Sequence, residues 1–157
     1  LHLPRLRSRP EAYDPATRDR LLAGALLPAG PVIQAHRFRA WFRDKIHEIF
    51  NSYDILVAPA TPGAAPLQAD PVLLLDGKHV NARANLGLFT QPLSLAGVPV
   101  LSAPLPPPSD VAGSNRVSAM PVGIQLIAAP GQEERLFSLA IMLEKEGFLG
   151  RPAAQWL

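Results

Sequence analysis

The sequence contains no cysteine, and this absence excludes several kinds of chemistry. Disulfide bonds, thiolate metal sites and a cysteine nucleophile all require that residue. A reducing cytoplasm suits such a chain, so we expect a cytoplasmic protein. Apolar runs of about 18 to 20 residues, the length needed to cross a bilayer, are also missing, because Pro, Gly or a charge interrupts every stretch. We therefore expect a soluble chain with no membrane partner.

Positive charge is unevenly distributed, because Arg residues crowd the first fifty positions while the rest of the chain is nearly neutral. Acidic residues are interleaved with them at Asp14, Asp19, Asp44 and Glu48, and no block of five or more Lys or Arg would neutralise a run of phosphates. A solvated helix surface is the usual explanation. We expect no nucleic-acid partner; the alternative, DNA binding through these helices, predicts retention on DNA that falls steeply with salt.

Targeting and metal signals are weak as well. The first ten residues carry three Arg but neither an initiator Met nor a following apolar core, so we expect no export signal and a start in mid-protein. The four His residues are too scattered for a recognisable ligand spacing; they are His2, His36, His47 and His79. We expect no metal site and no cofactor.

What is present predicts an α/β chain. Its 157 residues, of which 48% are hydrophobic, suffice for one domain, mainly helical over 1–52, with strands, loops and a closing helix over 53–157. We expect four helices: from Asp14-Pro15 to about Leu27, from near Val32 to Phe50, a short one from Ala82 to about Leu88, and one from Glu133 that ends by Gly147. We expect strands at Asp54–Pro59, Val100–Leu105 and Met120–Ala128. A hairpin should pair Val72–Leu75 with Lys78–Val80 through a turn at Asp76-Gly77.

Apolar periodicity predicts how these elements pack. A helical stripe should face the core; it comprises Phe38, Phe42, Ile46, Ile49 and Phe50. The three strands lack polar alternation, which favours strands covered on both faces and at least partly parallel. Three strands are fewer than the five or six of an average sheet, so we expect an incomplete sheet that other chain completes. Residues 106–118 should form a mobile loop.

Four segments, taken together, resemble the amidase-signature family in order and spacing. They are YDILVAPATP (residues 53–62), PLSLAGVPVLSAP (92–104), MPVGIQLIA (120–128) and the closing helix. Each motif alone is weak, but four in register are specific, and the helical region before them fits the family's lead-in. Residues 82–92, ARANLGLFTQP, are most similar to the bacterial biuret and carboxybiuret hydrolase branch. The resemblance implies part of that family's mixed sheet, flanked by helices and incomplete here.

The resemblance also implies amide or ureido C–N hydrolysis by a Ser–cis-Ser–Lys triad, in which Lys deprotonates a bridging Ser that activates the nucleophilic Ser. The family places these residues and its Gly/Ser-rich oxyanion loop upstream of this block. Here no two Gly and no two Ser are adjacent, and the Lys residues, Lys45, Lys78 and Lys145, fall on elements expected to be solvated. We assign no catalytic residue and expect the chain alone to be inactive. Its expected partners are the N-terminal part of the same enzyme, a small amide or ureido substrate, and a second copy or a small accessory subunit.

The stretch before the Pro/Gly motif supplies the substrate-binding candidates, because in the resembling enzymes it lies close to the substrate pocket. They are Arg83, Asn85, Phe89, Thr90 and Gln91. A planar guanidinium would bind a substrate carboxylate through two parallel hydrogen bonds, which Lys cannot do. A surface helix with a solvated Arg is the alternative. Gln125, inside an apolar strand, should hydrogen-bond a neighbouring loop or support the oxyanion loop.

Two other functions stay open beside the amidohydrolase. The amidase subunit of a tRNA-dependent amidotransferase shares the Pro/Gly motif and the closing strand and helix. A non-catalytic remnant that keeps the fold to bind a partner is the second. An upstream Gly-Ser-Ser-Gly-like segment and a Lys in the adjacent coding sequence would separate enzyme from remnant.

Overall fold

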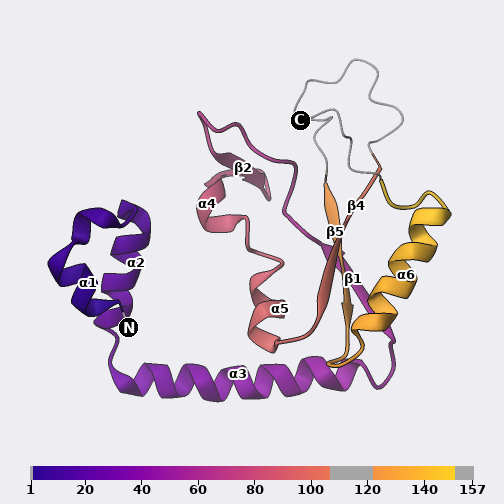
Figure 1. Ribbon diagram of the computed structural model, residues 1–157, viewed down its shortest axis with the longest axis horizontal. Helices are drawn as coiled ribbons and strands as arrows, with labels where there is room; N and C mark the ends of the chain where they lie inside the picture. Colours follow the sequence, from indigo (N-terminus) through magenta and orange to yellow (C-terminus); the bar gives the residue numbers. More distant parts are fainter. Residues whose placement is uncertain (1, 107–121, 151–157) are drawn as a thin grey trace. The chain divides into compact units, whose positions relative to one another are not determined.

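The computed structural model of this 157-residue chain describes residues 2–106 and 122–150 (Figure 1). The helices are α1 (Leu3–Ser8), the short 3-10 helix η1 (Pro10–Ala12), α2 (Pro15–Ala25), α3 (Ala29–Ile49), α4 (Ala82–Asn85), α5 (Gln91–Ala96) and α6 (Glu133–Lys145). The strands are β1 (Ile55–Pro59), β2 (Val72–Leu75), β3 (Lys78–Asn81), β4 (Val100–Pro104) and β5 (Gly123–Ala128). The chain divides into two compact units, residues 1–41 and 42–157. The loop expected after residue 106 lies outside the described residues.

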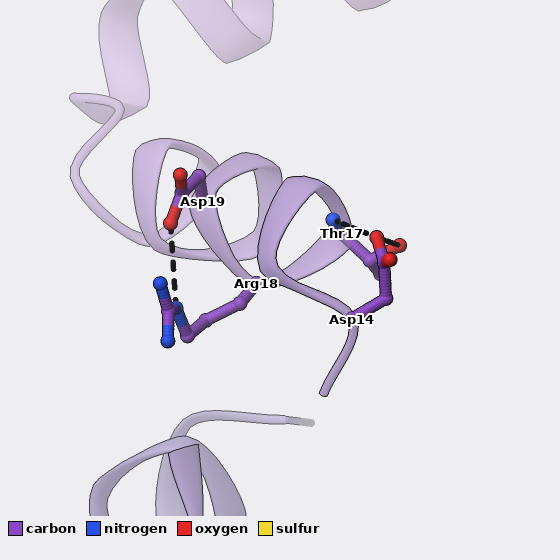
Figure 2. Close-up of polar contacts among 4 residues, drawn as sticks. All are labelled: Asp14, Thr17, Arg18 and Asp19. Carbon is purple, nitrogen blue, oxygen red and sulfur yellow. Dashed lines mark hydrogen bonds and ion pairs between the residues drawn. The ribbon is translucent and has the colours of Figure 1, made fainter. Parts of the chain in front are cut away.

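Asp14 caps the N-terminus of α2, as the sequence predicts. Its side chain accepts hydrogen bonds from the backbone N and the Oγ1 of Thr17, at 3.1 and 3.3 Å (Figure 2). These bonds satisfy an amide of the first turn, and Pro15 has no amide to leave unpaired. Arg18 pairs with Asp19 at 3.4 Å, so neighbouring acidic groups partly offset the Arg charge of this helix.

Two helix boundaries differ from the prediction. Helix α2 ends at Ala25 rather than Leu27, and α3 begins at Ala29 although Gly30 and Pro31 follow. The early start is possible because a proline in the first helical turn removes only an amide that has no intrahelical partner. Pro31 therefore does not prevent the helix from starting before Val32.

The apolar stripe of α3 is less covered than expected. None of its residues is fully buried, and Phe38 is 53% exposed while Phe42 and Ile46 are half-buried. The prediction of a core stripe is therefore wrong for the residues that the structure describes. Helical periodicity identifies a face that can be buried, but it does not identify the segment that covers it.

The three strands recognised in the sequence form one sheet with the order β1-β5-β4. Both pairings are antiparallel, with Leu126 opposite Val57 on one side and Leu101 on the other. The expected parallel pairing is thus wrong for these strands. A continuous apolar run indicates burial on both faces, and β5 has such burial between two antiparallel neighbours. The incomplete sheet itself is as predicted.

Helix α6 packs on one face of this sheet and forms the core of the unit with β5 (Figure 1). Leu126, Ala128 and Leu136 are fully buried, and the other expected core positions of α6 are packed against them; these are Leu139, Ala140 and Leu143. Glu133 and Glu134 lie in its first turn, where they complement the helix dipole.

Gly147 ends α6 in the way that the sequence suggests. Its φ is 78°, the amide of Phe148 donates to the carbonyl of Leu143 at 2.9 Å, and the amide of Gly147 donates to that of Glu144 at 3.1 Å. This pair of bonds defines a Schellman motif, which requires a left-handed residue and so favours glycine.

The hairpin of β2 and β3 forms as predicted, and it leads directly into the candidate segment. Asp76 and Gly77 both have positive φ, at 49° and 71°, which matches the tight turn whose twist suits a two-residue hairpin. Asn81 then caps α4 by accepting a hydrogen bond from the amide of Ala84 at 3.2 Å. Helix α4 ends at Asn85, earlier than the expected Leu88.

We predict that Leu136→Ala lowers the free energy of unfolding by about 2 to 5 kcal/mol, because it leaves a cavity between α6 and β5. Phe137→Ala is the matched control on the same helix. Phe137 is 60% exposed, so its truncation should change stability by only about 0.5 kcal/mol. Urea denaturation of the three proteins measures both values, and equal losses would contradict this account of the core.

Candidate functional site

The five candidate residues lie on one continuous segment that runs from α4 to the first residue of α5. Arg83 is exposed on α4, Asn85, Phe89 and Thr90 are half-buried, and Gln91 is exposed. The structure therefore places them on neighbouring turns of a single segment, which we call the 83–91 segment.

Backbone carbonyls of the segment hold two of the polar candidates. The Nδ2 of Asn85 donates to the carbonyl of Asn81 at 2.8 Å, and the hydroxyl of Thr90 donates to the carbonyl of Gly87 at 3.3 Å. Both bonds are local, and they fix the side-chain directions of Asn85 and Thr90. Each of these side chains can also accept a hydrogen bond from a ligand, Asn85 through its amide oxygen and Thr90 through its hydroxyl oxygen.

Gln91 folds back over Gly87. A Cβ atom added at Gly87 would lie 2.9 Å from the Nε2 and 3.1 Å from the Cγ of Gln91. The backbone closes the same turn, since the amides of Thr90 and Gln91 both donate to the carbonyl of Gly87, at 3.2 and 2.9 Å. The side chain of Gln91 therefore lies against bare backbone that only glycine provides.

Gln125 connects the segment to the sheet. This residue of β5 is 3% exposed, and its Nε2 donates to the carbonyl of Phe89 at 3.3 Å and to that of Pro59 at 2.8 Å. The expected hydrogen bond to a neighbouring loop is confirmed. The candidate set nevertheless omits Gln125, although one signal was available: a single amide within an otherwise apolar strand.

The three lysines of the chain lie on the surface of α3, β3 and α6. Lys45, Lys78 and Lys145 are all exposed, and the Nζ of Lys45 forms an ion pair with Glu48 at 2.7 Å. A lysine that acts as a base is usually desolvated or lies near another positive charge.

Clusters of metal-ligating side chains and membrane-spanning helices were both sought in the described part of the chain. Within residues 2–106 and 122–150, no cluster of three or more His, Asp or Glu side chains is arranged to hold a metal ion. None of the helices in these ranges combines the length and the apolar character needed to span a membrane.

Comparison with known proteins decides the family, because the family model described as Amidase matches residues 6–137. The chain belongs to the amidase family. This amidase chain is 41% identical over 147 residues to AtzE of Pseudomonas sp. strain ADP, which is a 1-carboxybiuret hydrolase subunit; the match covers 94% of the chain and 31% of AtzE. It is 33% identical over 129 residues to one of the glutamyl-tRNA(Gln) amidotransferase subunits of Zymomonas mobilis, covering 79% of the chain and 23% of that protein.

Structures of similar proteins agree with the amidase fold. A vestigial protein complex that reveals the evolutionary origins of an s-triazine catabolic enzyme superposes with a TM-score of 0.83 at 38% identity, over 94% of this chain and 31% of that one. A crystal structure of an amidase superposes with a TM-score of 0.81 at 29% identity, over 95% of this chain and 32% of that one. The amidase chain thus spans between about a quarter and a third of the length of these relatives. The resemblance drawn from its four motifs is confirmed.

We predict that Gly87→Ala displaces Gln91 with little change in stability, because only a flexible side chain has to move. The NMR signals of the Gln91 amide group should shift. Two other glycines with no atom within 4 Å of the added Cβ serve as controls. Gly24→Ala within α2 should raise the free energy of unfolding by about 0.5 to 1 kcal/mol, and Gly77→Ala, at a φ of 71°, should lower it by about 1 to 2 kcal/mol. An unshifted Gln91 signal would contradict the contact.

Proposed function

We propose that this chain is the C-terminal part of an amidohydrolase that cleaves the C–N bond of a small carboxamide or ureido substrate, with a carboxybiuret-like molecule as the leading candidate. The 41% identity to a 1-carboxybiuret hydrolase component over 94% of the chain carries the proposal. The lack of cysteine suits an enzyme of the reducing cytoplasm.

The proposed reaction uses a Ser–cis-Ser–Lys triad supplied by residues upstream of this chain. The Lys amine accepts a proton from the bridging Ser, which accepts one from the nucleophilic Ser. The nucleophile then attacks the carbonyl carbon, the oxyanion is stabilised by backbone amides, and the protonated nitrogen leaves. Water hydrolyses the remaining acyl-enzyme. The exposure of all three lysines in this chain supports a base located elsewhere.

The chain's own contribution would be substrate recognition by the 83–91 segment. Arg83 is exposed on α4, where its guanidinium can approach a carboxylate from solvent. Asn85 and Thr90 would offer hydrogen-bonding atoms whose directions the local backbone already fixes. Phe89 and Gln91 would line the remaining surface. Such fixed groups lose little conformational entropy on binding.

The N-terminal part of the same enzyme is the partner that we propose first. In residues 42–157 several large apolar side chains are exposed, as is usual for surfaces that bind another protein segment; they include Val57, Phe137, Ile141 and Phe148. A second copy of the chain or a small accessory subunit would use the same kind of surface.

A second candidate is the amidase component of a tRNA-dependent amidotransferase. It rests on the 33% identity to a glutamyl-tRNA(Gln) amidotransferase component over 79% of the chain. The two candidates differ in substrate, because the amidotransferase component would act in the amidation of glutamyl-tRNA(Gln), whereas the first would hydrolyse a ureido compound. Assays of the full-length enzyme with both substrates separate them.

The decisive experiment compares the 157-residue chain with and without a separately expressed N-terminal half. We predict that the chain alone shows no amidase activity above background and no serine labelling by a fluorophosphonate. Adding the N-terminal half should restore hydrolysis and raise the melting temperature, because ligands that bind only the folded state stabilise it. Stoichiometric labelling of a serine in the chain alone would contradict the proposed division of the active site. A stable monomer whose melting temperature does not change when the N-terminal half is added would favour a non-catalytic binding module.

We predict that Arg83→Lys in the full-length enzyme raises the KM for an anionic ureido substrate about tenfold, because Lys cannot replace a bidentate guanidinium. The KM for a neutral amide should change little. Arg37→Lys, at an exposed position of α3, is the matched control and should leave both values unchanged. Equal effects of Arg83→Lys on both substrates would assign Arg83 a structural role.

A further inference from the structure

Gln125 is the buried polar residue of the described core, and its position in the sheet is unusual. It lies in the central strand β5, opposite Ala58 of β1 and Ser102 of β4. Directly paired residues of antiparallel strands share a face, and successive residues alternate between faces. Leu126, which packs with α6, therefore faces one way and Gln125 the other.

The face that carries Gln125 is the one on which the 83–91 segment lies. The hydrogen bond from its Nε2 to the carbonyl of Phe89 joins residues 36 positions apart in the sequence, and the bond to Pro59 joins residues 66 positions apart. Both acceptors are backbone atoms. One amide group thus links the end of β1, the centre of β5 and the candidate segment.

Strand β5 has few other ways to hold this segment. Strand β5 is paired on both edges, with β1 and with β4, so its backbone groups are used in the two ladders. A side chain is the remaining route from this strand to a neighbouring backbone carbonyl. A buried amide is costly unless it is hydrogen-bonded, so Gln125 and the segment stabilise each other's positions.

We propose that Gln125 is a positioning residue for substrate recognition: it fixes the backbone at Phe89 and thereby the directions of Phe89, Thr90 and Gln91. With Phe89 fixed against the sheet, the turn from Gly87 to Gln91 has a single arrangement, in which the side chain of Gln91 packs against Gly87. The part of this inference that concerns substrate rests on the proposed function. The part that says Gln125 holds the 83–91 segment against the sheet rests on the contacts alone.

The test uses Gln125→Met in the full-length enzyme that carries this chain. Met is close to Gln in length but has no N–H donor, so the carbonyls of Phe89 and Pro59 lose this partner. Amide hydrogen exchange of residues 86–94 should accelerate at least about tenfold, while exchange within α6 stays unchanged. Ile127→Val, two residues along the same strand and on the same face, is the matched control and should leave the segment's exchange unaltered.

Kinetics supply the second readout. Gln125→Met should raise the KM for the ureido substrate about tenfold and leave kcat within about twofold, because the proposed reacting groups lie upstream. Gln125→Asn keeps the amide but is one methylene shorter, so it should give the same pattern and replaces Gln125→Met if that variant does not fold.

The outcomes test separately whether Gln125 holds the segment and whether the enzyme has the proposed function. Unchanged exchange in residues 86–94, or equal acceleration in α6, would overturn the positioning role. So would faster exchange of the segment with an unchanged KM in an active enzyme. If the unmodified full-length enzyme hydrolyses neither ureido nor amide substrates, the proposed function fails, and hydrogen exchange still decides whether Gln125 holds the segment.

Discussion

The burial of β5 is the constraint on which the larger unit depends. Four consecutive residues of this strand are buried, from Gln125 to Ala128, and both of its edges are paired. A fully buried leucine such as Leu126 contributes about 1.5 to 3 kcal/mol, but only if neighbours cover it from every side. The sheet, α6 and the segment before α5 are arranged around this requirement.

Elements with local signals can be predicted from the sequence. Asp14 before Pro15, Asp76 before Gly77, and Gly147 after α6 each specify a backbone geometry through their own chemistry, and each does so here. Strand direction has no such local signal. The apolar runs indicate burial, and β5 is buried over four consecutive residues although both of its neighbours are antiparallel, so its sequence does not distinguish the two arrangements.

The candidate site is predictable only in part, for a related reason. Resemblance to a family indicates the 83–91 segment, and the local bonds of Asn85 and Thr90 follow from the short reach of their side chains. The partners of Gln125 lie 36 and 66 residues away, and no local pattern specifies them. A lone amide in an apolar strand indicates that a partner exists; the fold is needed to identify it.

The outer surface of α6 carries more apolar side chains than a helix with one solvated face usually does. A helix that covers a sheet usually has one apolar stripe and a polar opposite face. Helix α6 buries Leu136 against β5, yet Phe137, Ile141 and Met142 are exposed on other sides of the helix. Apolar side chains around most of the circumference are typical of a helix enclosed within a protein. The same holds for Val57, which is 63% exposed on β1. These surfaces have the composition of interior elements, which is why we propose further amidase sequence as their first partner.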